Sequence, residues 1–217
     1  MMQVSAFKWV QPFAHGLVRD LRVRWALEEP GLGYDDYLVG GDDQASPAYR
    51  AWQPFGQVPA FRDDRVEMFE SGAIVLYLSQ KSDQLMPQDE AGRAMVMTWM
   101  FAALNSVEPF VTSVTTIDLF HSDAAWAVER RPQVEEALRR RLGDLQAALG
   151  ERQWFAGDTF SGADILMTTV LRFLRHTDIL ADYPALSAYV ERCTARPAFK
   201  RALAEQIAPF KAHEAAA

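Results

Sequence analysis

The sequence predicts an α/β domain over residues 1–81 and an all-helical domain over residues 91–217, joined by a polar linker over residues 82–90. Three observations support this division. Patterns typical of strands and of helices alternate in the first part, whereas beyond the linker no strand alternation is convincing. The linker is polar and contains Pro87, which disfavours a continuous helix. The fold class is therefore α/β followed by all-α.

The first domain is expected to open with a strand, a helix and a second strand. The opening residues alternate loosely in hydrophobicity and include Phe7. In the helix, Leu21 and Trp25 recur on a buried face, and we assign Arg22 and Arg24 to polar positions. The expected elements are a strand over residues 4–10, a helix over residues 18–29 that ends at Pro30-Gly31, and a strand over residues 34–39.

A hairpin and a further helix complete this domain. Residues 59–62 and 66–69 are typical of two short strands around an Asp-Asp turn. Ser71 then precedes apolar residues at helical spacing, which makes it a natural N-cap. Residues 42–53, before the hairpin, are interpreted as an irregular crossover. The order strand-helix-strand and then strand-strand-helix matches a thioredoxin-like domain.

Helices alone are expected in the second domain. A polar segment with a proline, residues 105–109, interrupts the first helical stretch and predicts a kink. Ser161 and Asp164 have the spacing of a capping box, in which the aspartate reaches back to the serine N–H. The helical stretches run over residues 91–115, 123–150, 161–177 and 183–205, the last divided at Pro197.

Composition excludes several classes of protein. The 217 residues are 49% apolar and 24% charged with a net charge of −7, which is ordinary for a globular protein and unsuited to nucleic-acid binding. No apolar run approaches the roughly 20 residues of a membrane span, and no signal pattern opens the chain, so we expect a cytoplasmic protein with no membrane partner. The single cysteine, Cys193, excludes an internal disulfide, and the histidines lack metal-ligand spacing, so no metal is expected.

The corner at Glu70 and Ser71 is the first candidate binding site. The N-terminus of the helix that begins there offers free N–H groups and the positive end of the helix dipole, which favour an anion. The Ser71 hydroxyl can contact the same anion, and the Glu70 carboxylate can take a cation beside it. Such a corner suits the head group of an amino acid. The alternative is that Ser71 serves only as a helix cap.

The Val58-Pro59 bond is the second candidate feature. An X-Pro bond at the mouth of a strand is a plausible cis site and would leave the main-chain groups of Val58 unpaired by the sheet. An extended peptide could pair with those groups. The alternative is an ordinary trans turn.

Two motifs together resemble a known family. Gly-x-Val-Pro over residues 56–59, a short hairpin, and Glu70-Ser71 at a helix start look like the glutathione-binding half of the cytosolic glutathione transferases. The capping box at Ser161, preceded by Phe160, resembles the capping-box and staple motif of that family's helical domain. The resemblance spans both parts of the chain. It implies the glutathione transferase fold, a thioredoxin-like N-terminal domain and an all-helical C-terminal domain.

The resemblance also implies how one end of glutathione would be held. In the family, the Glu-Ser pair binds the γ-glutamyl group, and this role carries over to Glu70 and Ser71. The residue before a cis-proline pairs with the cysteinyl backbone, and this role carries over to Val58 beside Pro59.

For the glycyl and sulfur ends of glutathione, the candidates come from two other segments. Gln44 and Gln57 lie where related chains often contact the glycyl carboxylate. The family stabilises the thiolate with a Tyr, Ser or Cys just after the first strand, and this sequence has none of the three there. Gln11 and His15 are the nearby polar side chains and become the catalytic candidates, with the main-chain N–H groups of residues 14–17 as further donors. For His15 the alternative is a surface histidine without a catalytic task.

The implied activity is that of a glutathione S-transferase, with glutathione as co-substrate and a small apolar electrophile as the second substrate. A glutathione-dependent disulfide reductase or peroxidase, an isomerase, and a non-catalytic carrier of glutathione or an apolar ligand remain alternatives. The family pairs along the first helix of the helical domain, which implies a homodimer.

Overall fold

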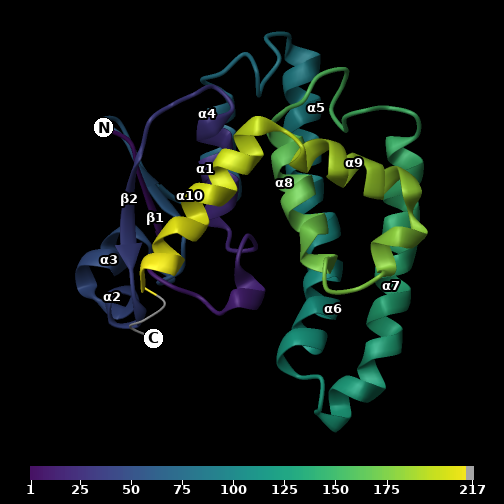
Figure 1. The fold of residues 1–217 in the computed structure, drawn as a ribbon. Coiled ribbons are helices and arrows are strands. Elements are labelled where there is room, and N and C mark those ends of the chain that lie inside the picture. Colours follow the sequence, from purple (N-terminus) through teal and green to yellow (C-terminus); the bar gives the residue numbers. More distant parts are fainter. Residues whose placement is uncertain (214–217) are drawn as a thin grey trace. The chain divides into compact units, whose positions relative to one another are not determined.

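The computed structural model describes residues 1–213, which group into two compact units. The first unit comprises Met1–Met86 together with the chain from Ala195 onward, and the second comprises Pro87–Thr194. Figure 1 traces the elements of both. The last helix, which we expected in the helical domain, packs within the first unit instead. The boundaries 1–81, 82–90 and 91–217 otherwise stay a prediction.

A mixed four-stranded sheet forms the centre of the first unit, in the order β2-β1-β3-β4. Strands β1 and β2 are parallel, and Val4 of β1 lies opposite Asp36 of β2. The pairs β1–β3 and β3–β4 are antiparallel, and Val4 also lies opposite Phe61 of β3. This mixed sheet confirms the predicted order of elements. The strands are β1 (Gln3–Phe7), β2 (Asp35–Val39), β3 (Ala60–Arg62) and β4 (Glu67–Phe69).

Three longer helices belong to this unit: α1 (Asp20–Glu28), α4 (Ser71–Ser79) and α10 (Pro197–His213). In Figure 1, α10 runs beside α1. The ring of Trp25 on α1 meets Phe199 on α10 edge to face at 4.9 Å between centroids. Arg196 donates two hydrogen bonds of 2.7 Å to the Glu29 carboxylate just after α1. Apolar burial and ion pairs therefore attach α10 to α1.

The crossover between β2 and β3 contains two short helices, α2 (Gly41–Ala45) and α3 (Pro47–Trp52), so the prediction of an irregular segment was wrong. Local caps account for them. The Asp43 carboxylate accepts the Gly40 N–H at 2.8 Å, and the Ser46 hydroxyl accepts the Tyr49 N–H at 3.2 Å. Pro47 occupies the first position of α3, where its missing N–H costs nothing. Ser46-Pro47, within the segment interpreted as irregular, is therefore a helix start.

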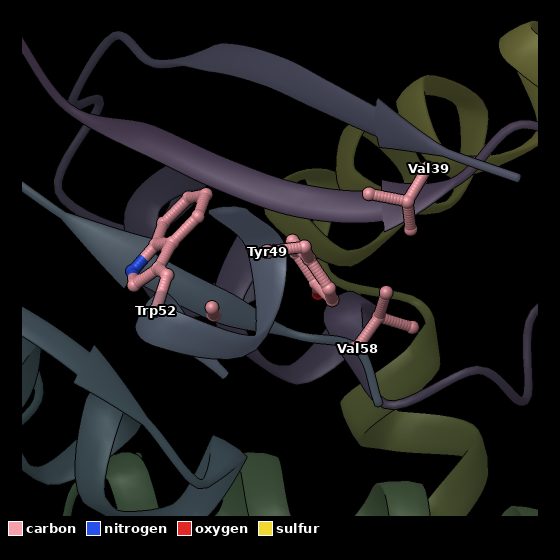
Figure 2. Close-up of a cluster of buried hydrophobic side chains, with 5 residues drawn as sticks. Val39, Tyr49, Trp52 and Val58 are labelled. Atoms are coloured by element: carbon pink, nitrogen blue, oxygen red, sulfur yellow. The ribbon is translucent and has the colours of Figure 1, made fainter. Parts of the chain in front are cut away.

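A hydrophobic cluster joins these short helices to the sheet. Figure 2 shows Val39 from β2, Tyr49 and Trp52 from α3, and Val58 from the segment before β3. All four side chains are at most 8% exposed. Val18, at the start of the chain segment leading into α1, packs against the same cluster. The cluster therefore holds residue 58 near the loop that precedes α1.

The second unit is helical, as predicted. The expected first long helix is divided: a π-helical segment, Ala102–Val107, lies between α5 and α6, and Pro109 falls in the first turn of α6. The predicted kink is thus an insertion of π-helix, which widens the turn where the proline cannot donate. The helices are α5 (Glu90–Phe101), α6 (Glu108–Phe120), α7 (Ala125–Leu149), α8 (Gly162–Leu171) and α9 (Pro184–Thr194).

Asp164 anchors the start of α8. Its carboxylate accepts the N–H groups of Ser161 at 2.9 Å and Phe155 at 3.1 Å, and the Tyr189 hydroxyl of α9 at 2.9 Å. The bond back to Ser161 confirms that half of the predicted capping box. The predicted end of this helix at residue 177 was wrong, because α8 ends at Leu171 and a short 3-10 turn follows.

One continuous helical stretch of the second unit, Glu90–Phe120, has the length and hydropathy of a membrane span. Core helices of water-soluble proteins often meet the same two criteria, so this is weak support for a membrane location.

Candidate functional site

The chain passes from β4 into α4 through a single residue, Glu70. Its carbonyl oxygen accepts the first helical hydrogen bond, from the Ile74 N–H at 3.0 Å, so Glu70 is the N-cap and Ser71 is the first helical residue. The prediction of Ser71 as N-cap was therefore one residue too late. Glu70 has a φ of 69°, which is unusual for a residue with a Cβ. Such conformations cluster at functional sites, and this one presents an exposed carboxylate at the helix start.

Ser71 lies against a buried arginine. Its side chain is 5% exposed, and the Arg22 Nη1 donates to its Oγ at 3.2 Å. The sequence pattern predicts a polar position for Arg22 on α1, but the residue is 1% exposed. Arg24 is equally buried and donates to the Asp20 carboxylate at 2.8 Å. Apolar periodicity misses such residues, because a buried arginine does not contribute to an apolar stripe.

The Val58-Pro59 bond is cis, which confirms the predicted isomer. Side chains hold the segment around it. The Tyr49 hydroxyl donates to the Gln57 carbonyl oxygen at 2.6 Å, and the Ala60 N–H donates to the Ser5 Oγ at 2.6 Å. Within residues 1–213, no hydrogen bond engages the main chain of Val58. Its N–H and C=O are therefore unpaired among the described residues.

Gln44 and Gln57 come from neighbouring segments. Gly56 has a φ of 63°, and a Cβ there would lie 2.8 Å from the Gln44 carbonyl oxygen, so only glycine fits this approach. The Gln44 side-chain nitrogen is 3.4 Å from the Gly40 carbonyl oxygen, whereas Gln57 is exposed. Their proposed role toward the glycyl carboxylate stays a prediction.

The loop after β1 holds both catalytic candidates. It contains a 3-10 turn, Pro12–Ala14, with Gln11 exposed at its start and His15 at its end. The His15 Nε2 lies 3.1 Å from the Val10 carbonyl oxygen, and its ring stacks on Phe210 of α10 with centroids 5.0 Å apart. Because a carbonyl oxygen only accepts, Nε2 must carry hydrogen in this contact. In the neutral ring of this tautomer Nδ1 is a proton acceptor, and no hydrogen bond to it occurs within residues 1–213.

Main-chain donors in this loop are already engaged. The N–H groups of Ala14, His15 and Leu17 bond to the carbonyl oxygens of Gln11, Pro12 and Ala14 at 2.9, 3.2 and 2.9 Å. Their role toward the sulfur stays a prediction, since these bonds lie within the loop itself. The bonds maintain the turn that carries Gln11 and His15.

Helix α10 supports this loop from one side. The Gln206 side-chain amide donates to the Val18 carbonyl oxygen at 3.1 Å and to Asp20 Oδ1 at 2.6 Å. Asp20 is fully buried, and its burial raises the pKa of its carboxyl despite the neighbouring Arg24. Sequence patterns gave no sign of this contact, because Gln206 lies almost two hundred positions away along the chain.

Cys193 is buried in the second unit, and burial raises the pKa of its thiol to about 12. Few thiolates form at such a pKa, so this residue is unsuited to redox chemistry at neutral pH. No group of three or more His, Cys, Asp or Glu side chains suited to a metal ion occurs in the described part of the chain.

Comparison with known proteins gives two family matches. The model of the glutathione S-transferase N-terminal domain matches residues 21–85, and the model of the C-terminal domain matches residues 95–197. An uncharacterised glutathione transferase-like protein of Streptococcus mutans is 30% identical over 220 residues, covering 90% of this chain and 82% of that protein. A glutathione S-transferase of Hyoscyamus muticus is 28% identical over 84% of this chain and 92% of its own.

A relative with a different activity and a solved structure complete the comparison. The disulfide-bond oxidoreductase YghU of Escherichia coli is 33% identical over 147 residues, which cover 64% of this chain and half of that protein. The crystal structure of a glutathione transferase from Burkholderia graminis, with two glutathione molecules bound per subunit, matches with a TM-score of 0.81 at 29% identity. That match covers 93% of this chain and 87% of the other.

Proposed function

Because the chain belongs to the glutathione S-transferase family, we propose that it binds glutathione in its first unit and joins the thiol to a small apolar electrophile. The observation that carries this proposal is the corner at Glu70 and Ser71. There an exposed carboxylate and a hydroxyl flank the N-terminus of α4, which suits both charges of an amino-acid head group. We also propose the cytoplasm as its location, where glutathione is kept reduced.

The cysteinyl and glycyl parts of glutathione are assigned to other residues of the first unit. The main chain of Val58, beside the cis bond to Pro59, would pair with the cysteinyl backbone in the manner of an added strand. Gln44 and Gln57 would then contact the glycyl carboxylate. Support for this comes from the close approach of Gly56 to Gln44, which keeps both glutamines on adjoining segments.

The thiol of glutathione would lie toward the loop that carries Gln11 and His15. A free thiol with a pKa of about 8.5 is only slightly ionised at neutral pH, and each unit of lowering requires about 1.4 kcal/mol. We propose that His15 accepts the thiol proton at Nδ1, since the Val10 carbonyl oxygen selects the tautomer with hydrogen on Nε2. Gln11, exposed at the start of the turn, would donate to the resulting thiolate.

A second candidate function is reduction of disulfides by glutathione. It is favoured by the relation to YghU, a disulfide-bond oxidoreductase, although that similarity covers half of the relative. In such a reaction the bound thiolate attacks one disulfide sulfur, forms a mixed disulfide with it and releases the other sulfur as a thiolate. A second glutathione then attacks the mixed disulfide and leaves as glutathione disulfide. A peroxidase or a carrier without turnover uses the same binding residues, so binding alone does not distinguish these functions.

We further propose that the protein is a homodimer paired along α5. Met95 and Phe101 on this helix are 43% and 58% exposed, so α5 offers apolar side chains to a partner. A second copy of the chain would cover these side chains.

The proposed function is tested by calorimetry with glutathione, followed by the ultraviolet absorbance of the bound thiolate across a pH titration. We expect binding, with a thiol pKa at least one unit below 8.5, and turnover with apolar electrophiles but not with disulfides. Ser71→Ala should weaken binding about tenfold. Absence of binding in the wild-type protein would refute the proposal, and binding without a shifted pKa would favour the carrier.

A further inference from the structure

The buried Arg22 has a specific place in the proposed glutathione site. It lies on α1 and is 1% exposed, and its Nη1 donates to the Ser71 hydroxyl oxygen on α4 at 3.2 Å. Arg22 takes part in at least one further interaction in the fold. Its guanidinium is therefore held in place on the inner side of the corner, while Glu70 lies on the exposed side.

The direction of this hydrogen bond determines what Ser71 can do. A guanidinium has donors and no acceptor, so the Ser71 Oγ must accept from Arg22. A hydroxyl has a single hydrogen, which then points away from the guanidinium toward another acceptor. With Arg22 in place, Ser71 is thus oriented as a donor, and the group that it recognises in a ligand must be an acceptor such as a carboxylate.

Electrostatics point to the same ligand group. The N-terminus of α4 carries a partial positive charge, and a cation placed there is on the unfavourable end of the helix dipole. An incoming carboxylate is attracted by both the helix terminus and the guanidinium behind the hydroxyl. The Glu70 carboxylate, exposed beside it, repels the same anion and favours an ammonium. The corner therefore favours a negatively charged group at Ser71 and a positively charged group at Glu70.

We propose that Arg22 is a positioning residue that turns the Ser71 hydroxyl toward the α-carboxylate of the γ-glutamyl group and so sets the orientation of the amino-acid head group. This inference rests on the proposed glutathione binding and deepens it. Arg22 itself acts through Ser71.

The test compares two ligands by calorimetry: glutathione, and 4-aminobutyryl-cysteinylglycine, which lacks only the α-carboxylate and keeps the ammonium. The wild-type protein should prefer glutathione. Arg22→Met should lower the affinity for glutathione about tenfold and leave the affinity for the analogue nearly unchanged. In a Ser71→Ala background the same change should cost little more, because the two residues act as one unit.

Conservative and matched variants separate positioning from folding. Arg22→Lys should restore part of the preference for glutathione, and it replaces the methionine variant if that one does not fold. Arg24→Lys, on the same helix and equally buried, is the control and should affect both ligands alike. An equal loss for both ligands in the Arg22 variants, or no loss, would overturn the inference. Failure of the wild-type protein to bind glutathione would overturn this inference together with the proposed function.

Discussion

At the scale of single residues, buried polar groups decide the geometry of the candidate site. Glu70, Ser71 and the cis bond before Pro59 were recognisable from the sequence, because turn chemistry and helix starts leave local signals. The contact of Arg22 was not recognisable, because its partner Ser71 lies 49 positions away and because a charged residue is expected at the surface. The placement of the His15 ring likewise involves a contact that no local pattern reveals, the ring of Phe210.

The proposed role of His15 as a base belongs to this scale. His15→Phe keeps an aromatic ring to stack on Phe210 and removes Nδ1. We expect kcat to fall on the order of a hundredfold, the usual contribution of a general base, with glutathione affinity unchanged. The measurement is steady-state kinetics at saturating glutathione. Unchanged turnover would exclude the imidazole, and a loss of affinity instead would assign His15 to support of the loop.

At the scale of elements, strands and long helices were predictable and the connections were less so. The strand order was predictable from the order of strands and helices along the chain. Helices α2 and α3 were not, because they depend on short-range caps, and residues of the same composition also form turns. The π-helical segment between α5 and α6 could not be derived, because a proline predicts an interruption without specifying how the backbone accommodates it.

A contact between elements in the second unit makes stability depend on pH. Asp118 on α6 accepts two hydrogen bonds from Arg131 on α7, at 2.5 and 3.0 Å, and one from His176 at 3.1 Å. Burial alone would raise the pKa of Asp118, but these bonds outweigh it and hold the pKa below its ordinary 3.8. The unfolded chain therefore takes up this proton first as the pH falls, and the stabilisation present above 3.8 is lost as pH falls through the folded pKa.

Asp118→Asn should accordingly lower the free energy of unfolding by about 1 kcal/mol at pH 7 and by progressively less below pH 4. Urea unfolding at several pH values measures both effects. Glu136→Gln is the control, because the Glu136–Arg140 pair is largely exposed and should contribute little. A difference between wild type and Asp118→Asn that stays constant down to pH 2 would contradict the assignment.

At the scale of the whole molecule, assembly with a second copy is the main expectation. Phe101→Glu places a charge on the exposed face of α5 and should convert a dimer to monomers, because an unpaired charge is costly in a buried interface. Sedimentation velocity across a range of protein concentrations measures the change. Val128→Glu, at an equally exposed apolar residue on α7, is the control and should leave the dimer intact. A wild-type protein that sediments as a monomer would refute the pairing along α5.

The return of α10 to the first unit gives that unit a discontinuous sequence, and this bears on how the chain is made. A ribosome releases residues 1–86 before it has completed the second unit, and Gln206 and Phe210 emerge near the end of synthesis. A nascent chain that has just completed α9 already contains Glu70, Ser71 and Val58 but lacks the helix that supports the loop of His15. The proposed sulfur end of the site would thus be the last part of the first unit to mature during translation, because a chain truncated after residue 194 lacks the contacts of Gln206 and Phe210.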